Sequence, residues 1–248
     1  MEWRARFTAP IHMRFVPLFL GLAVWLRAAE SFQISSAETR THLLELFSSE
    51  GCSSCPPAEQ WLGGLLDSPG LWRDFVPVSF HVAYWDRLGW PDRFATKAYT
   101  NRQYAYSQEW QTNSVYTPEF VLDGLEWLGG RSEARLSPSA EPAGKLTLTL
   151  APDGNCRVTF GRQGRFEVHV AILGGGITSR IEAGENRGRT LHHEFVAMGL
   201  TSAPLEAGFV ELKLTVPNMA GVTRRGLAAW ITRRDELVPL QVVGGWLD

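Results

Sequence analysis

Two cysteines separated by two residues stand between a strand-like segment and a helix-like segment. Residues 41–47 read Thr-His-Leu-Leu-Glu-Leu-Phe, a mostly apolar run that is typical of a buried strand. Cys52 and Cys55 follow, and Pro56-Pro57 then suits the first turn of a helix. We expect both sulfur atoms to lie at the N-terminus of this helix and to be able to form a disulfide. At such a position the helix dipole and the free backbone N–H groups favour the thiolate.

The composition is that of an ordinary globular protein. The chain has 248 residues, of which 44% are hydrophobic and 20% are charged, so it is long enough for one large domain or two small ones. Its formal net charge is −2, and it becomes −5 without residues 1–29, which hold four arginines and one glutamate. A mildly acidic protein lacks the basic surface that nucleic acid requires, so we expect no nucleic-acid partner.

Residues 1–29 have the pattern of a secretory signal peptide. Three arginines precede an apolar run over residues 15–26, and Ala28 and Ala29 follow it. The run is shorter than the ~20 residues of a membrane-spanning helix, so we expect no stable membrane span once the segment is removed. An uncleaved N-terminal anchor is the alternative. Export would place the protein in the periplasm or outside the cell, where a cysteine pair can persist as a disulfide.

Residues 41–135 have the pattern of an α/β domain, preceded by a linker over residues 30–40. Residues 75–82 alternate like a second strand. The order is therefore strand, helix, strand, which predicts a parallel pair with a right-handed crossover.

An aromatic-rich insertion is expected within this domain over residues 84–116. All five tyrosines of the chain lie in it, and residues 91–111 read as helical. After the insertion, Asp123-Gly124 predicts a tight hairpin turn between two short strands.

The pattern changes to β after a stretch rich in Ser, Pro, Ala and Gly over residues 130–144. We expect a second, β-rich domain over residues 142–248, with the sandwich-like packing that several short strands and turns favour. Cys156 is expected to be a buried small residue in one of these strands, and a regulatory or intermolecular role is the alternative. The strand candidates cover residues 145–150, 156–160, 166–173, 209–216 and 227–233.

Four segments carry a resemblance to a known family. They read ELFSSEGCSSCPPA over 45–58, HVAYWD over 81–86, YTP over 116–118 and GENRGR over 184–189. Together they resemble domain-of-unknown-function family 1223, a bacterial family of secreted, thioredoxin-like proteins. The resemblance covers about residues 40–245. It implies an α/β fold in which a thioredoxin-like N-terminal domain precedes the β-rich domain, and it supplies no activity.

The resemblance and the residues together suggest roles in thiol–disulfide exchange. Cys52 is expected to be the exposed nucleophile and Cys55 the resolving thiol. In thioredoxin-like folds a cis proline faces the disulfide, which implies that Pro118 is that residue. Glu45 is the charge in an otherwise apolar strand, and a buried carboxylate can accept the proton of the resolving thiol. The alternative for Glu45 is a structural ion pair.

Three further residues are expected to contact the substrate. The backbone of Thr117 can pair with an extended peptide. Tyr84 and Trp85 follow the second strand, at the end where ligand sites of α/β sheets form. The aromatic side chains of the insertion have an alternative role, which is to pack a helical hairpin on the core.

The leading hypothesis is an exported thiol–disulfide oxidoreductase that needs no cofactor and acts on protein or small-molecule thiols and disulfides. The alternative is a periplasmic metal-binding or interaction module that uses the same cysteines, with His81 as a candidate further ligand. Thiol peroxidase chemistry is a third hypothesis. A further alternative is that the disulfide is purely structural and takes no part in catalysis. We assign no metal site, because nothing in the spacing of His81 and the cysteines demands one. His192 and His193 could also bind a metal, but adjacent histidines usually point to different faces.

Overall fold

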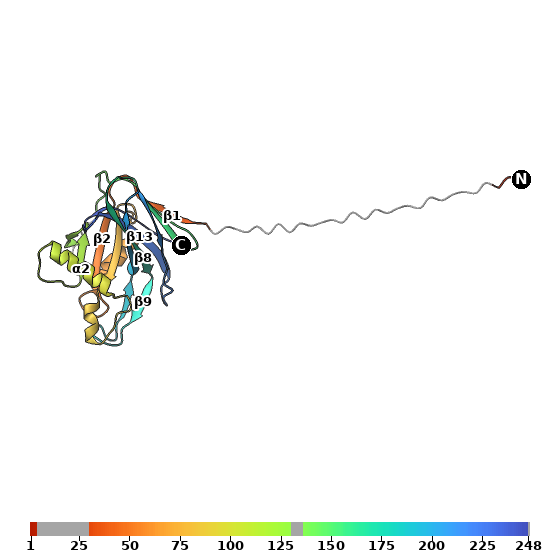
Figure 1. The fold of residues 1–248 in the computed structure, drawn as a ribbon. Coiled ribbons are helices and arrows are strands. Elements are labelled where there is room, and N and C mark those ends of the chain that lie inside the picture. The colour runs from red at the N-terminus through yellow and green to blue at the C-terminus, as the bar shows by residue number, and fades with distance from the viewer. Residues whose placement is uncertain (4–29, 130–135, 248) are drawn as a thin grey trace.

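A computed structural model describes residues 1–3, 30–129 and 136–247 of the chain (Figure 1). The predicted signal peptide lies almost wholly outside the described residues. In the described part of the chain, no helix is long and apolar enough to cross a membrane.

The predicted strand–helix–strand unit is confirmed. β2 (His42–Ser48) is followed by the disulfide turn and by α1 (Pro56–Gly64), and the short helix η1 (Leu65–Asp67) leads to β3 (Phe75–His81). β2 and β3 pair in parallel along their whole length. Every residue of β3 is buried, as expected for a central strand whose two faces are both covered.

The predicted hairpin is also confirmed. β4 (Glu119–Leu122) runs antiparallel to β2, and β5 (Leu125–Glu126) returns beside it. Asp123 and Gly124 form the turn with φ values of 50° and 86°, which Asp and Gly adopt more readily than other residues.

The expected fold class, an α/β fold with a separate thioredoxin-like domain, is wrong. The strands of both expected domains form one eight-stranded mixed sheet in the order β14-β13-β8-β11-β3-β2-β4-β5. The junction is β11 (Val196–Leu205), which pairs with β8 along its length and in parallel with β3 through Val196 and Ser79. Figure 1 shows β2, β8 and β13 in this continuous sheet. The protein is therefore a β-rich fold in which two helices cover part of one large sheet.

A second, four-stranded sheet packs on this large sheet and has the order β1-β6-β7-β12. Its apolar side chains and those of β8, β13 and β14 form one buried cluster. Residues 30–40 are not the expected linker, because β1 (Phe32–Ser35) is an edge strand of this sheet paired with β6. Cys156 lies in β7 as a buried free thiol, as predicted for a small core residue.

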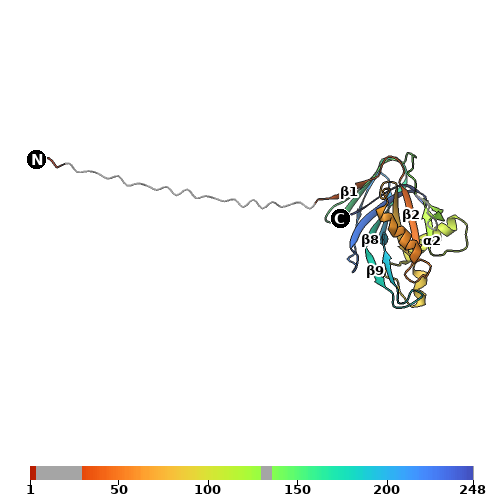
Figure 2. The same ribbon diagram turned by 180° about the vertical axis from the view of Figure 1, so that it is seen from behind.

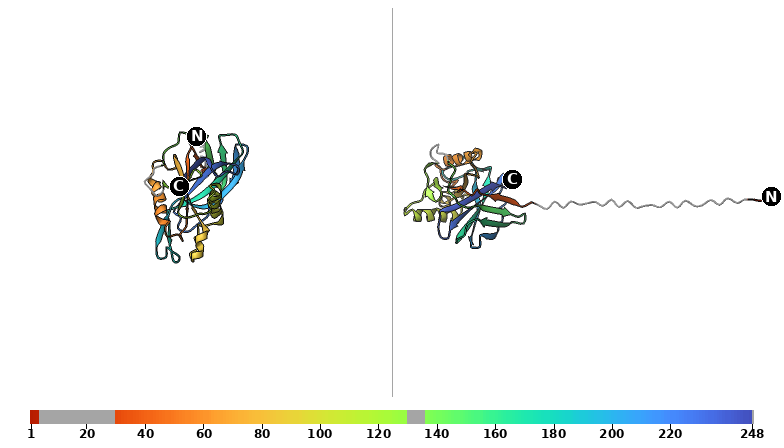
Figure 3. Two further views of the ribbon diagram at one scale, coloured as in Figure 1. Left: turned by 90° about the vertical axis from the view of Figure 1, so that its left-hand side faces the viewer. Right: turned by 90° about the horizontal axis from the view of Figure 1, so that it is seen from above.

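The two longer helices lie on opposite faces of the large sheet. Alternate residues of β2 point to different faces, so that Leu44 and Leu46 pack with α1 whereas Leu43 and Phe47 pack on the side of α2 (Lys97–Glu109). α1 covers the face that is turned to the viewer in Figure 2, and Figure 3 shows α1 in orange and α2 in yellow-green apart from each other. α2 is shorter than the expected helix over 91–111.

The remaining elements complete the description. β9 and β10 form a separate two-stranded antiparallel sheet. The bounds are η2 (Ala83–Leu88), β6 (Leu146–Leu150), β7 (Asn155–Phe160), β8 (Phe166–Gly175), β9 (Ile177–Arg180), β10 (Thr190–His193), β12 (Phe209–Lys213), β13 (Arg224–Arg233) and β14 (Pro239–Trp246).

Candidate functional site

The two cysteines form a disulfide at the start of α1. Their Cα atoms are 5.5 Å apart, and Cys55 is the residue that caps the N-terminus of the helix. Both cysteines are 0% exposed, whereas Ser53 and Ser54 between them are exposed. The expectation of an exposed Cys52 is therefore wrong for this form of the protein.

The helix start offers fewer backbone donors to the sulfur atoms than expected. Pro56 and Pro57 have no N–H group, and the next two N–H groups, of Ala58 and Glu59, donate to the carbonyl oxygen of Cys55. The hydroxyl of Ser54 is the group beside the first sulfur, with its Oγ 3.3 Å from Cys52 Sγ. A side-chain hydroxyl thus stands where backbone N–H groups were predicted.

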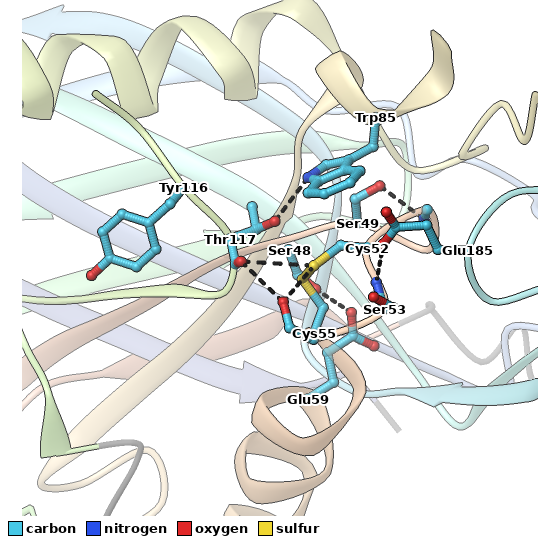
Figure 4. Close-up of a disulfide and its surroundings, with 12 residues drawn as sticks. Ser48, Ser49, Cys52, Ser53, Cys55, Glu59, Trp85, Tyr116, Thr117 and Glu185 are labelled. Atoms are coloured by element: carbon cyan, nitrogen blue, oxygen red, sulfur yellow. Dashed lines mark hydrogen bonds between the residues drawn. A yellow bond between two sulfur atoms is a disulfide. The ribbon is translucent and has the colours of Figure 1, made fainter. Parts of the chain in front are cut away.

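The Thr117-Pro118 peptide bond is cis, as the resemblance implied, and it lies beside the disulfide. The carbonyl oxygen of Thr117 is 3.7 Å from Cys52 Sγ and accepts a hydrogen bond from Ser54 Oγ at 3.3 Å (Figure 4). Trp85 donates from Nε1 to Thr117 Oγ1 at 2.8 Å. Thr117 and Trp85 are therefore the predicted substrate residues that the structure brings to the disulfide.

Trp85 packs closely on the turn before Cys52. A Cβ atom added at Gly51 would come within 3.0 Å of Trp85 Cβ, so the glycine gives the tryptophan room. Tyr84 lies beside Trp85, with the centroids of the two rings 6.2 Å apart, and its hydroxyl donates to Gln103 of α2 at 3.3 Å. Burial raises the pKa of Tyr84 to about 12, against the opposing effect of its hydrogen bonds with Thr117 and Gln103.

Glu45 is not brought to the cysteines. Its carboxylate forms a two-pronged ion pair with Arg102 of α2, with distances of 2.5 and 3.0 Å, and accepts a hydrogen bond from the Tyr106 hydroxyl. Glu45 shares the face of β2 that α2 covers, whereas α1 begins after Cys55 on the opposite face. These contacts correspond to the structural ion pair that the sequence left open, and the geometry gives no support to proton exchange with Cys55.

Residues 184–189, here called the covering loop, lie against the disulfide turn. Asn186 is fully buried, and its Nδ2 donates to the carbonyl oxygens of Glu50 and Cys52, both at 2.9 Å. Arg189 donates to Asn186 Oδ1 at 2.8 Å, and the Ser53 N–H donates to Glu185 at 3.1 Å. The covering loop therefore fixes the turn that holds the cysteines, a contact that the sequence left open beside a plain surface turn.

A group of buried polar residues adjoins the disulfide turn, and we call it the His–carboxylate cluster: Glu50, Glu59, His81, Asp92 and His193. His81 Nδ1 lies 2.6 Å from Asp92 Oδ2, and its Nε2 lies 3.9 Å from Glu59 Oε1. His193 Nδ1 bonds to Glu59, and its Nε2 lies 3.3 Å from Glu50 Oε1. Ser48 also donates to Glu59, and Figure 4 shows both residues near the disulfide. Glu59 follows Cys55 by four residues in the chain.

The electrostatics of the cluster follow from burial opposed by close opposite charges. Burial lowers the pKa of His193, but the charge of Glu59 and hydrogen bonds to Glu50 and Glu59 outweigh it and raise that pKa to about 10. Burial disfavours ionised Asp92, yet the charge and hydrogen bond of His81 lower its pKa to about 2. Burial likewise raises the pKa of Glu59 and His193 lowers it, with a net lowering. Each carboxylate is thus kept ionised by a histidine.

The sequence singled out His81 only as a candidate ligand beside the cysteines, and His193 was set aside together with His192. His193 comes from β10, where Leu191 and His193 are buried and Thr190 and His192 are exposed. Adjacent histidines point to different faces here as well: His192 is exposed, and His193 is buried and joins the cluster. The alternation of Leu191 with His193 was the signal that could have placed His193 on a buried face.

The comparisons with known proteins agree with this fold. The model of a family described as "Protein of unknown function (DUF1223)" matches residues 43–232, and the chain belongs to that family. The X-ray crystal structure of an Agrobacterium tumefaciens protein, a structural genomics target, is similar with a TM-score of 0.59 and 26% identity, over 86% of this chain and 96% of that one.

A second solved structure, HBP35 of Porphyromonas gingivalis, is similar with a TM-score of 0.50 and 11% identity, over 86% of this chain and 77% of that one. At this identity the likeness concerns the fold alone. No curated protein matches the chain.

Proposed function

We propose that the protein is an exported thiol–disulfide exchange protein whose redox pair is Cys52 and Cys55. The observation that carries this proposal is the disulfide at the N-cap of α1, with the carbonyl oxygen of Thr117 3.7 Å from Cys52 Sγ. The two cysteines are three residues apart in the sequence, so their disulfide closes a small ring and does not link distant segments of the chain. Its place at the start of α1 puts it beside the positive end of the helix dipole, which favours a thiolate even though the first backbone N–H groups do not reach the sulfur atoms.

The exchange reaction is a two-electron transfer. The thiolate of reduced Cys52 attacks one sulfur of a partner disulfide, forms a mixed disulfide and releases one partner thiolate. The thiolate of Cys55 then attacks Cys52 Sγ, which re-forms the internal disulfide and releases the second partner thiolate. The protein dithiol is oxidised and the partner disulfide is reduced, and the same steps run in reverse when the partner is a dithiol.

Nearby groups support these roles. The Ser54 hydroxyl lies 3.3 Å from both Cys52 Sγ and the carbonyl oxygen of Thr117, so in the reduced protein its one proton can turn from the carbonyl to a thiolate at Cys52. The hydrogen bond from Trp85 holds Thr117, so that its carbonyl remains beside the sulfur. An extended partner segment would approach along this Thr117 backbone. Because both sulfur atoms are buried, exchange requires the turn or its cover to open.

Turnover of insulin or of a small model disulfide tests the proposal. Cys52→Ser should abolish turnover, and Cys55→Ser should accumulate mixed disulfides that mass spectrometry detects. Cys156→Ala is the matched control, because this thiol is buried in β7 and burial raises its pKa to about 11. Full turnover by both single variants at the redox turn would show that the proposal is wrong.

A further inference from the structure

We propose that the His–carboxylate cluster is a zinc-binding site in which Glu59, His81 and His193 ligate the ion. This inference goes beyond the exchange reaction, and it uses neither cysteine. The three residues come from α1, β3 and β10, and each is buried. Two imidazoles and one carboxylate form a ligand set that proteins use for Zn²⁺.

The donor atoms are close enough to share one ion. One ligand atom from each of the three residues lies within 4.8 Å of the other two. Bonds to Zn²⁺ of about 2.0–2.2 Å in tetrahedral geometry need donor atoms that are closer than this, so each donor has to move by about an ångström or less. Side-chain rotations provide movements of this size.

The Nε2 atoms of the two histidines point to a ligand. Both atoms are buried, and neither forms a well-aligned hydrogen bond with a described residue, although each faces a carboxylate oxygen, His81 at 3.9 Å and His193 at 3.3 Å. Both side chains are at most 1% exposed. Oε1 of Glu50, 3.3 Å from His193 Nε2, is buried and contacts that nitrogen without a well-aligned hydrogen bond. Buried polar atoms without partners are rare in native proteins, and a metal ion is one of the partners that explain them.

The surroundings of the ligands have the form of a metal site. His81 has its Nδ1 on Asp92, an arrangement that leaves Nε2 for an ion and fixes the ring. Asp92 is itself held, since it accepts hydrogen bonds from the backbone N–H groups of Glu50 and Phe94. Glu50, whose Oε2 accepts from Trp90 at 2.7 Å, stands where a fourth ligand would be.

The charge of the cluster is compatible with a cation at this place. Glu50, Glu59 and Asp92 are three buried carboxylates, and burying carboxylates is unfavourable unless positive charge accompanies them. A divalent ion with two neutral imidazoles supplies the same positive charge as two protonated histidines, so the ion can replace their protons. A surface cavity of about 510 Å³ has Glu50, Trp90 and Ser179 among its lining residues and offers a route by which the ion reaches the site.

The site would connect the redox turn with its cover. Glu59 belongs to the helix that Cys55 caps, and His193 ends the strand that the covering loop enters. A zinc ion between them would hold α1 and β10 together, so its removal should loosen the covering loop.

The test is metal analysis of the full chain. After removal of metal by a chelator and incubation with Zn²⁺, inductively coupled plasma mass spectrometry should find one zinc ion per chain. Glu59→Gln should lose this zinc, and Asp92→Asn should weaken binding about 10- to 100-fold, as loss of a residue that orients a ligand does. His192→Ala is the matched control, because His192 is exposed and its Nδ1 lies 3.2 Å from Thr178 Oγ1, on the strand face away from the cluster. This variant should bind zinc like the wild type.

Two further results separate this site from metal binding by the cysteines. The Cys52→Ser/Cys55→Ser variant should still bind one zinc ion, whether or not the exchange proposal is right. Co²⁺ in the wild-type protein should show the visible bands of a nitrogen and oxygen site without thiolate charge-transfer absorption, a readout that needs no variant. Absence of stoichiometric zinc in the wild type, or thiolate absorption with Co²⁺, would overturn the inference.

Discussion

Asn186 offers a direct test of the idea that the covering loop shields the disulfide. Its side chain is fully buried and donates to the carbonyl oxygens of Glu50 and Cys52. Cys52 O also accepts from the Cys55 N–H, at 3.3 Å, so it would retain one partner in Asn186→Ala. Loss of the bond to Cys52 costs about 1 kcal/mol, and a buried Glu50 carbonyl left without this donor costs about 1–3 kcal/mol, which makes about 2–4 kcal/mol in total.

This loss should appear as faster reduction of the disulfide. Both cysteines are 0% exposed, so a small thiol reaches them only when the cover opens. A decrease of about 2 kcal/mol in the free energy needed to open the cover raises the reduction rate about 30-fold, because each 1.4 kcal/mol is a factor of ten. The assay is reduction by dithiothreitol at low concentration, followed by alkylation and thiol counting by mass spectrometry.

Arg187→Ala is the matched control, because Arg187 lies in the same loop and is exposed. It should be reduced at the wild-type rate. Reduction of Asn186→Ala at the wild-type rate, together with an unchanged melting temperature, would refute the view that the covering loop guards the disulfide.

Three other predictions concern stability. Arg102→Met should destabilise the fold by about 3–5 kcal/mol in denaturant unfolding, because Glu45 stays buried without its partner, and a further Glu45→Met should recover much of the loss. Burial raises the pKa of Glu119 from 4.5 to about 7. The stability that its protonated form provides is therefore complete below pH 4.5 and is lost as the pH rises through 7. Glu119→Gln should flatten this part of the pH profile of the melting temperature, and an unchanged profile would contradict the prediction. Trp85→Phe should cost about 1 kcal/mol through the lost bond to Thr117, and equal unfolding midpoints would count against that contact.

Local patterns predicted the part of the fold around the disulfide. The apolar run before Cys52, the prolines after Cys55 and the Asp123-Gly124 turn each specify backbone conformation within a few residues, and the structure has the expected elements there. The cis peptide before Pro118 followed from family resemblance, since spacing alone carries no information on the isomer.

The larger architecture depended on pairings that no local pattern reveals. β11 has Gly199, Ser202 and Pro204 among its residues, and β14 has a leading proline and two adjacent glycines, so neither alternates as a typical strand does. The parallel pairing of Val196 with Ser79 joins segments more than one hundred residues apart. For this reason two domains were expected where one large sheet exists.

The same limit applied to the site. Glu59 and His193 are 134 residues apart in the sequence, and their contact depends on how β10 returns to α1. Glu45 was correctly expected to be buried, but its partner Arg102 lies 57 residues further on, in an insertion whose packing the sequence did not predict. The sequence predicted the chemistry of single residues, but it did not predict which residues they contact across the fold.

The most direct test of the central claim is the reduction potential of the Cys52–Cys55 pair, measured by titration with glutathione buffers and thiol counting by mass spectrometry. A redox-active pair should titrate as one reversible two-electron couple between about −270 and −120 mV, the range of known exchange proteins. A couple below about −300 mV would identify a structural disulfide and would contradict the account.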